Sequence, residues 1–388
     1  MENKPSNHLT NLEKSLPSLC YFDEDFYNKE LSEIWSKNWI YVCHKSRLSK
    51  KLSYETIKLG KQSVIIVKDS KDKLKAYYNT CRHRGSILCQ ESSGKLSSKA
   101  FVCPYHQWSY HIDTGELLKI ASFSNTPDGF DKKNFSLFPV KLKEWRGCIF
   151  INLNSNAIWD ENLLFQRTPD AFKNFPIEDM IVSNVWEKTI NCNWKSFWEN
   201  FNECLHCPNV HPELTKLVPM FTRRIINSQD LSGWVPKTKE SDPKFSGGLK
   251  KGAQTWSEDG YAQGCQINSL SESDLLKGHI YASSWPSVFI GGYADHIRIV
   301  RVKPTESEKV TITSEWLFEE ETLKNENYDR ENVISFACRV MEQDALACEL
   351  NQKGIHSSPY QNGVLMPEEY VIKKFHDWLR GQLKTPKI

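Results

Sequence analysis

Residues 81–106, CRHRGSILCQESSGKLSSKAFVCPYH, decide how the first half of this chain folds. They contain Cys81 and His83 as a C-x-H pair, a gap of nineteen residues, and then Cys103 and His106 as a C-x2-H pair. Each pair follows a segment with the composition of a β-strand, so two turns on neighbouring hairpins can bring two thiolates and two imidazoles together. Sulfur and nitrogen ligands of this kind select zinc or an iron-sulfur cluster. We therefore expect a metal site within a small β domain.

Two kinds of metal group fit these four residues. A 2Fe-2S cluster with cysteines on one iron and histidines on the other needs this ligand set. A tetrahedral zinc site could be built from the same side chains. The neighbouring Arg84-Gly85 and Pro104 favour the cluster, because the backbone N–H groups of such turns can bond to cluster sulfurs and tune the potential. Zinc remains the alternative at this point.

The pattern of the chain changes near residue 160. Between about Gly60 and Leu153, short β segments alternate with turns, which predicts a small antiparallel β domain. Helix-like stretches follow around residues 191–206 and 330–352, with strand-like runs between them. The fold class that we expect is α+β, with helices against an antiparallel sheet. We assign two domains, residues 40–158 and residues 1–39 together with 159–388.

Composition excludes several classes of function. The 388 residues are 39% hydrophobic and 25% charged, as in an ordinary globular protein, and the formal net charge of +2 offers no field for a phosphate backbone. We therefore expect no nucleic-acid partner. The polar first residues lack the apolar core of a signal peptide, and no stretch is long and apolar enough for a membrane span. We expect a cytoplasmic protein with no membrane partner, and we assign the twelve cysteines to metal binding and burial rather than to a disulfide scaffold.

A second constellation of ligands lies in residues 193–211, NWKSFWENFNECLHCPNVH. Apolar and polar residues recur there at helical spacing, and the polar stripe ends with Glu203 and His206. Pro208 disfavours further helix just before His211. The pattern predicts that His206 lies at a helix end and His211 in the turn beyond it, aimed at one metal ion.

Two alternatives apply to this segment. In the first, the polar stripe simply faces solvent, although the residues around it are apolar. In the second, Cys204 and Cys207 join His206 and His211 in a zinc site, which would crowd three donors onto one helical turn.

The third ligand of the second site is expected to be a carboxylate, and Asp344 is the candidate. Val333, Phe336, Ala337 and Val340 place it within an apolar face of a predicted helix. A buried carboxylate is costly without a strong partner such as a metal. The alternative is that the buried face of this helix is shifted by one residue, which would leave Asp344 exposed to solvent. With His206 and His211, Asp344 would complete a 2-His-1-carboxylate set that suits ferrous iron in non-heme oxygenases.

The first pattern looks like the Rieske signature, and its order before a larger α+β domain resembles the large subunit of Rieske oxygenases over roughly residues 20–380. The resemblance implies a helix-grip catalytic domain after the Rieske domain. The family motif acid-x2-His-x4-His matches Glu203, His206 and His211. By resemblance, Glu203 is catalytic and bridges His206 to the second Rieske histidine, here His106, of a neighbouring subunit. This chain departs from the commoner pattern, because Glu203 stands where Asp is usual.

The resemblance also implies partners and cofactors. Dioxygen chemistry needs two electrons, and the chain has no nucleotide-binding fingerprint for taking hydride. We expect a separate flavin and iron-sulfur reductase to supply electrons from NAD(P)H. A bridge between subunits requires an oligomer, and the family suggests a homotrimer.

The expected substrate is a small quaternary ammonium compound. The block NWKSFWENFNECLHCPNVHPEL and two later segments look most like Rieske monooxygenases of glycine betaine, carnitine and related betaines. The expected reaction is hydroxylation, or oxidative demethylation when a hydroxylated N-methyl group collapses. The alternative within the enzyme class is an aromatic-ring hydroxylating (di)oxygenase. Outside it, the alternatives are a Rieske electron-transfer protein and a zinc-stabilised binding protein.

Overall fold

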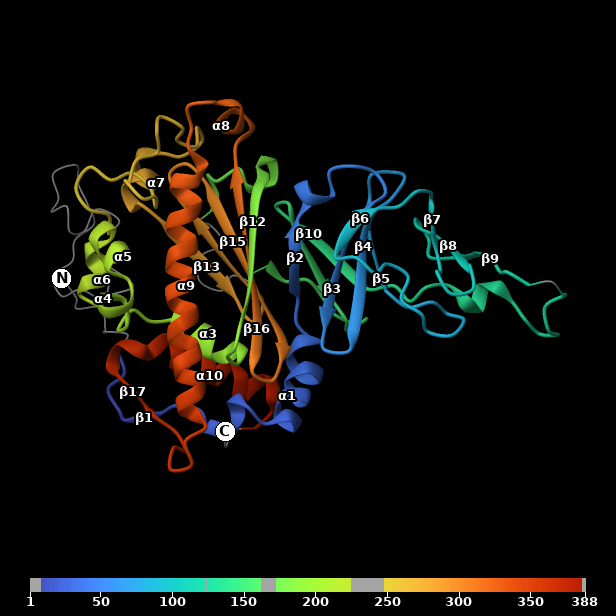
Figure 1. Cartoon of the computed structure of the whole chain (residues 1–388), viewed down its shortest axis with the longest axis horizontal. Coiled ribbons are helices and arrows are strands. Elements are labelled where there is room, and N and C mark those ends of the chain that lie inside the picture. Colours follow the sequence, from blue (N-terminus) through green and yellow to red (C-terminus); the bar gives the residue numbers. More distant parts are fainter. Residues whose placement is uncertain (1–7, 123, 162–171, 225–247, 386–388) are drawn as a thin grey trace. The chain divides into compact units, whose positions relative to one another are not determined.

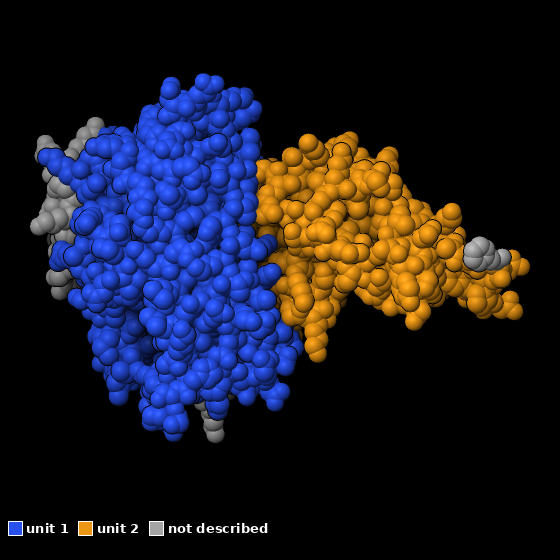
Figure 2. Space-filling view, viewed as in Figure 1, with its two compact units in different colours: residues 1–34, 161–388 blue, residues 35–160 orange. Residues whose placement is uncertain are grey.

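The chain forms two compact units, the smaller of residues 35–160 and the larger of residues 1–34 with 161–388 (Figure 2). The predicted α+β class is confirmed. The domain limits expected from the sequence, 40–158 and the remainder, stay a prediction about where independent domains begin and end. The computed structural model describes residues 8–122, 124–161, 172–224 and 248–385.

The smaller unit is built from short antiparallel strands, as the alternation of apolar residues and turns predicts. Its strands form three sheets, in the orders β5-β4-β3-β6, β7-β8-β9 and β10-β11-β2. The core joins Ile65 and Val67 to Phe101, Trp108 and Tyr110. The strands are β2 (Ile40–His44), β3 (Ser53–Leu59), β4 (Gln62–Lys68), β5 (Leu74–Tyr78), β6 (Ser93–Lys95), β7 (Ala100–Val102), β8 (Ser109–His111), β9 (Leu117–Lys119), β10 (Lys141–Trp145) and β11 (Cys148–Asn152).

The larger unit contains a five-stranded antiparallel sheet in the order β12-β16-β15-β14-β13. The long helix α9 runs along this sheet (Figure 1). A short strand pair, β1 with β17, ties the start of the chain to its last quarter. The strands are β1 (Glu13–Lys14), β12 (Ile181–Ile190), β13 (Ile280–Ser284), β14 (Val288–Gly292), β15 (Ile297–Glu306), β16 (Lys309–Phe318) and β17 (Val364–Leu365).

Helices of the larger unit supply the segments in which the second site was expected. Within the described residues, no helix is long and apolar enough to cross a bilayer. The α-helices are α1 (Glu24–Glu30), α3 (Trp194–Phe201), α4 (Cys207–Val210), α5 (Pro212–Leu217), α6 (Pro219–Thr222), α7 (Glu272–Lys277), α8 (Glu320–Lys324), α9 (Arg330–Ile355) and α10 (Tyr370–Leu383).

A buried ion pair anchors α3 to the start of the chain. Lys195 Nζ lies 2.6 Å from Glu30 Oε1, and both side chains are 0% exposed. Trp194 Nε1 donates to the other oxygen of Glu30 at 2.8 Å. Burial raises the pKa of Glu30, whereas Lys195 acts in the opposite direction and favours the carboxylate. The pair therefore holds two charges that neither side chain could keep alone in this interior.

Lys195→Met is expected to lower the free energy of unfolding by about 3–5 kcal/mol, because Glu30 would remain buried without a cation. The measurement is chemical denaturation of the variant beside the wild type. The double variant Glu30→Gln/Lys195→Met should recover part of the loss, since the amide still accepts from Trp194. Equal losses in the single and double variants would contradict the ion-pair explanation.

Candidate metal centres

The first site lies in the smaller unit, in two turns of matching hydrogen-bond pattern. The N–H of Gly85 donates to the carbonyl of Cys81, and the N–H of Gln107 donates to that of Cys103, both at 3.0 Å. Gly85 and Gln107 have positive φ values of 78° and 56°, which close each turn tightly. The repeated geometry places the two Cys-His pairs in equivalent positions.

The side chains of these turns separate into buried sulfurs and accessible rings. Cys81 and Cys103 are buried free cysteines. His83 is exposed and His106 half-buried, and their ring centroids lie 4.7 Å apart. The structure thus brings the two predicted pairs together, with soft ligands inside and imidazoles towards solvent. This donor set fits a 2Fe-2S cluster.

Two residues that sequence reasoning missed support the first site. Tyr110 lies on β8, and its hydroxyl is 3.2 Å from the Cys81 sulfur and accepts from the N–H of Arg82 at 3.0 Å. The ring of Trp108 stacks on His83, with centroids 4.7 Å apart and planes 11° from parallel. In the sequence, only their positions just after the second Cys-His pair indicated that Trp108 and Tyr110 could contact the metal site.

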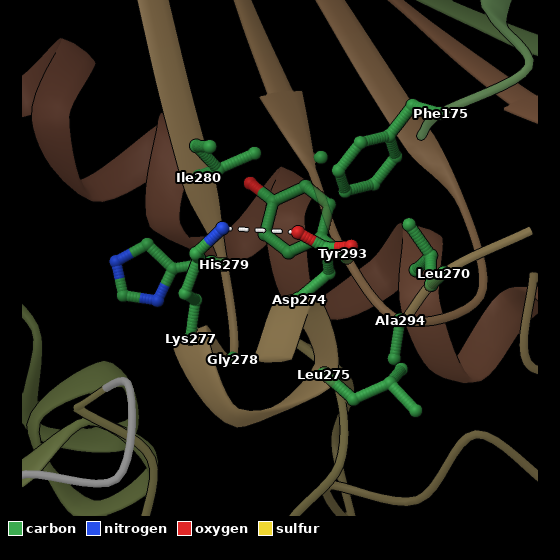
Figure 3. Close-up of a pocket in the computed structure, with 11 residues that line it drawn as sticks. Phe175, Leu270, Asp274, Leu275, Lys277, Gly278, His279, Ile280, Tyr293 and Ala294 are labelled. Atoms are coloured by element: carbon green, nitrogen blue, oxygen red, sulfur yellow. Dashed lines mark hydrogen bonds and ion pairs between the residues drawn. The ribbon is translucent and has the colours of Figure 1, made fainter. Parts of the chain in front are cut away.

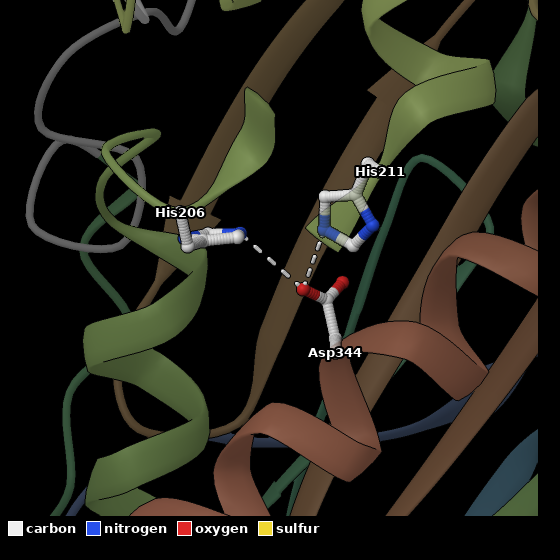
Figure 4. Close-up of side chains that lie close together, drawn as sticks. All are labelled: His206, His211 and Asp344. Atoms are coloured by element: carbon white, nitrogen blue, oxygen red, sulfur yellow. Dashed lines mark hydrogen bonds and ion pairs between the residues drawn. The ribbon is translucent and has the colours of Figure 1, made fainter. Parts of the chain in front are cut away.

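The second site brings His206, His211 and Asp344 together in the larger unit (Figure 4). One ligand atom from each of the three lies within 4.8 Å of the others. Nε2 of His211 is 2.9 Å from Asp344 Oδ1, and Nε2 of His206 is 3.4 Å from the same oxygen. Asp344 comes from α9 and its side chain is 15% exposed, so the alternative of an exposed helix face is wrong. The three residues form the 2-His-1-carboxylate set that ferrous iron prefers.

Hydrogen bonds fix which ring nitrogen each histidine offers. Nδ1 of His206 donates to the carboxylate of Glu203, and Nδ1 of His211 lies 2.8 Å from the amide oxygen of Gln343. Because each acceptor takes the Nδ1 proton, Nε2 is the nitrogen that each ring directs at Asp344 and the one that would bind a metal. Without a metal, Nε2 donates to the Asp344 carboxylate. Partners of this kind orient metal-binding histidines and raise their basicity.

Charge at the second site is arranged for a cation. Burial opposes a positive His206, yet hydrogen bonds to Asp344 and Glu203 raise its pKa to about 9. Burial also disfavours the Asp344 carboxylate, yet hydrogen bonds from His206 and His211 hold its pKa well below the usual range. Asn200 Nδ2 adds a further hydrogen bond to Asp344 Oδ1 at 2.6 Å. A divalent metal would replace protons in a pocket that already favours positive charge.

The helix predicted over residues 191–206 is shorter in the structure. Helix α3 ends at Phe201, so Glu203 and His206 lie in an irregular segment beyond it, and the predicted continuous polar stripe is wrong there. A second helix, α4, follows at once and contains Pro208. Proline is tolerated in the first turn of a helix, where its missing N–H has no partner to lose. As a result, His206 lies just before α4 and His211 just after it, rather than both on one continuous helix.

Gln343 is a functional candidate that sequence reasoning missed. It precedes Asp344 on α9, and its Nε2 donates to Glu213 Oε2 at 3.2 Å, which holds its amide oxygen towards His211. Gln343→Leu is expected to weaken iron binding at the second site by about 10- to 100-fold, since His211 loses its acceptor. Anaerobic titration of metal-depleted protein with ferrous iron measures this. Glu213→Gln, which leaves the acceptor in place, should have a smaller effect, and equal effects would remove the argument for Gln343.

Cys204 and Cys207 form a disulfide between the two histidines of the segment. Neither sulfur is then a thiolate, so this pair offers zinc no ligand in the structure described. The alternative zinc site through Cys204, Cys207, His206 and His211 is therefore not supported by the arrangement.

A separate hollow lies where α7 meets β13 and β14 (Figure 3). Its charged groups already have partners, because Asp274 binds Lys277, Ser271 and Asn174. The imidazole of His279 belongs to an aromatic cluster that includes Trp256, 5.2 Å away between ring centroids. Nδ1 of His279 is buried without a hydrogen-bond partner, and it is the one such side-chain atom in the lining among the described residues.

Comparison with known proteins covers almost the whole chain. Residues 38–132 match the family described as "Rieske [2Fe-2S] domain", and residues 173–385 match "Ring hydroxylating alpha subunit (catalytic domain)". The first match decides between cluster and zinc in favour of the cluster.

Individual relatives agree with the two family matches. The glycine betaine monooxygenase oxygenase subunit of Pseudomonas aeruginosa is 28% identical, over 94% of this chain and 88% of its own. The carnitine monooxygenase oxygenase subunit of Acinetobacter baumannii is 32% identical over 51% of this chain and 53% of its own. A solved quaternary ammonium Rieske monooxygenase shares the fold, with a TM-score of 0.73 and 21% identity over 98% of this chain and 99% of that one.

Proposed function

Because this chain belongs to the Rieske ring-hydroxylating oxygenase alpha-subunit family, we propose that it is the terminal oxygenase of a monooxygenase acting on a small quaternary ammonium compound. The observation that carries the proposal is the convergence of His206, His211 and Asp344, each held by its own hydrogen-bond partner. A protein that only transfers electrons through a 2Fe-2S cluster does not require a second, mononuclear metal site. The electron-transfer alternative is therefore disfavoured by the site itself.

The roles of the residues follow from their contacts. Cys81, His83, Cys103 and His106 would hold the 2Fe-2S cluster, and His206, His211 and Asp344 would hold one Fe²⁺. When bound, the cluster supplies single electrons and the mononuclear iron activates dioxygen. Glu203 and Gln343 keep the Nδ1 protons of the two histidines, and Asn200 steadies the carboxylate.

Aromatic side chains beside the second site suit a methylated ammonium group. Trp256 lies within 6.3 Å of Tyr281, Tyr293 and Phe336, measured between ring centroids, and Phe336 shares α9 with Asp344. Aromatic faces attract quaternary ammonium groups through cation–π interactions. Glycine betaine and carnitine, on which the named relatives act, both contain such a group.

The assembly is part of the proposal. A bridge from His106 of one subunit through Glu203 of the next would require an oligomer, and we propose a homotrimer. The solved quaternary ammonium monooxygenase is described as showing inter-subunit electron transfer, which supports this arrangement. A separate flavin and iron-sulfur reductase would deliver two electrons from NAD(P)H for each dioxygen. We also propose a cytoplasmic location.

The test begins with protein purified without oxygen. About three irons per chain and a reduced 2Fe-2S signal typical of histidine ligation are expected. With a reductase, the loaded enzyme should consume one dioxygen per product from glycine betaine, γ-butyrobetaine or carnitine, releasing formaldehyde if an N-methyl group is attacked. Turnover of an aromatic acid but of none of these compounds would replace the proposal by ring hydroxylation.

A further inference from the structure

Arg298 is a buried cation that lacks a counter-charge. It lies on β15 and is 4% exposed, and its Nε has no hydrogen-bond partner. Among the residues that the structure describes, no carboxylate forms an ion pair with it. Nε of Arg301 on the same strand is also buried without a partner, but the Arg301 guanidinium donates to Thr313 at 3.0 Å and lies 3.6 Å from Glu187. Burial alone therefore does not explain why Arg298 is unpaired.

Two more donors on the same face of the sheet are unsatisfied. Trp316 is the cross-strand partner of Arg298, and Ser314 is two residues before it on β16. Nε1 of Trp316 and the hydroxyl of Ser314 are both buried without a partner. Alternate residues on a strand share a face, so all three donors belong to one side of the sheet. Buried donors of this kind are normally satisfied, and an unfilled group indicates a missing ligand or water.

This face of the sheet is the one that borders the second metal site. Phe289 shares it with Arg298, whose guanidinium lies 5.8 Å from the Phe289 ring. Phe289 in turn stacks on Phe201, the last residue of α3, at 3.9 Å between ring centroids. The preceding residue, Asn200, donates to Asp344. Ring contacts through Phe289 and Phe201, and then the chain neighbour Asn200, thus lead from the Arg298 guanidinium to the carboxylate of the metal site.

The neighbouring tyrosines do not neutralise Arg298. The hydroxyls of Tyr281 and Tyr293 are 2.8 Å apart, and burial raises the pKa of both, so they stay uncharged. The charges of Arg298 and Asp344 both act on the pKa of Tyr281, which places it within range of each. A guanidinium cannot lose its proton to relieve the burial. The contact with Phe289 offsets only a small part of the cost.

We propose that Arg298 binds the carboxylate of the substrate and thereby restricts the enzyme to carboxylate-bearing betaines. The inference rests on the proposed function and names the substrate class more narrowly. The carboxylate would lie at Arg298 and the methylated ammonium group towards the second metal site. A cation without a carboxylate, such as choline, would leave Arg298 unpaired and be repelled by it. Arg298 then acts as a specificity-determining residue through both attraction and repulsion.

Three ligands of almost equal shape separate the two charges of the substrate. Glycine betaine has both charges, choline has the ammonium group without the carboxylate, and 3,3-dimethylbutyrate has the carboxylate without the ammonium group. Dissociation constants are measured by calorimetry without oxygen on the iron-loaded enzyme. The variants are Arg298→Gln and Arg298→Lys, with Arg301→Gln as the matched control on the same strand. The Rieske spectrum and the iron content show that each variant is folded.

The wild type should bind glycine betaine at least about tenfold more tightly than choline. Arg298→Gln should weaken glycine betaine and 3,3-dimethylbutyrate by about 10- to 100-fold and leave choline unchanged or tighter. Arg298→Lys should recover part of the loss, and Arg301→Gln should not change the order of the ligands. An equal effect of Arg298→Gln on all three ligands overturns the inference, as does no Arg298-dependent binding of any carboxylate.

The same experiment keeps the two proposals apart. If betaines are turned over and Arg298→Gln leaves their binding unchanged, the proposed function stands and the carboxylate site falls. If no quaternary ammonium compound is turned over but 3,3-dimethylbutyrate binds through Arg298, the carboxylate site stands and the proposed substrate falls.

Discussion

Asp344→Ala is expected to abolish turnover, by more than about a thousandfold, while the 2Fe-2S chromophore stays intact. The carboxylate is the only acid that the structure places within ligand range of both His206 and His211 among the described residues. Without it, two imidazoles remain in a pocket that no longer compensates a divalent charge. The iron content should fall from about three to about two per chain. The measurement is metal analysis together with the absorption spectrum and oxygen uptake.

A neighbouring acid provides the control for Asp344. Glu342 lies two residues earlier on α9, is exposed and pairs with Lys188 at the surface. Glu342→Ala should keep all the iron and nearly all the activity. Loss of the 2Fe-2S chromophore in Asp344→Ala, along with the mononuclear iron, would indicate a folding role and contradict the assignment of Asp344 as a ligand.

Glu203→Gln is expected to lower turnover by about a hundredfold and to leave both metal sites filled. The amide oxygen of glutamine can still accept the Nδ1 proton of His206, so the ring should keep its orientation. The negative charge disappears, and with it the carboxylate that we propose as the bridge to His106 of another subunit. Rapid mixing of reduced enzyme with substrate and dioxygen would follow oxidation of the 2Fe-2S cluster directly. That oxidation should be slow in the variant.

Glu203→Asp is the informative companion variant, because it introduces the acid that is commoner in the family at this position. It keeps the charge and shortens the side chain by one methylene, so partial activity is expected. Cluster oxidation at the wild-type rate in Glu203→Gln would refute the bridging role and leave Glu203 as a hydrogen-bond acceptor for His206 alone.

Local patterns were enough to find most of the metal-site candidates. The spacing of Val333, Phe336, Ala337 and Val340 correctly placed Asp344 on the inner face of a long helix, because helical periodicity is a local property. The family comparisons confirm the oxygenase class and both cofactors. The roles of the individual ligands stay predictions, although the structure brings the second set together.

The structural features that the sequence did not predict depend on contacts between residues distant in the sequence. Gln343 and His211 are separated by 132 positions, and no local sequence pattern predicts their hydrogen bond. Arg298 occurs in residues 287–304, a strand-like run in the sequence. The structure forms β14 and β15 within it, and only the pairing of Arg298 with Trp316 shows which face of the sheet Arg298 occupies. The end of α3 at Phe201 was also missed, since helix propensity beyond it was overridden by the turn that positions His206.

The larger unit is discontinuous in the chain, and this has a consequence for how the protein is made and rebuilt. Its first 34 residues are synthesised before the smaller unit. The ion pair of Glu30 with Lys195 can form only later, because Lys195 follows residues 35–160 in the chain. On the ribosome, the smaller unit can therefore fold first while the larger one remains incomplete. A chimera that exchanges catalytic units between relatives must transplant residues 1–34 together with 161–388, or Lys195 will be buried opposite a foreign side chain.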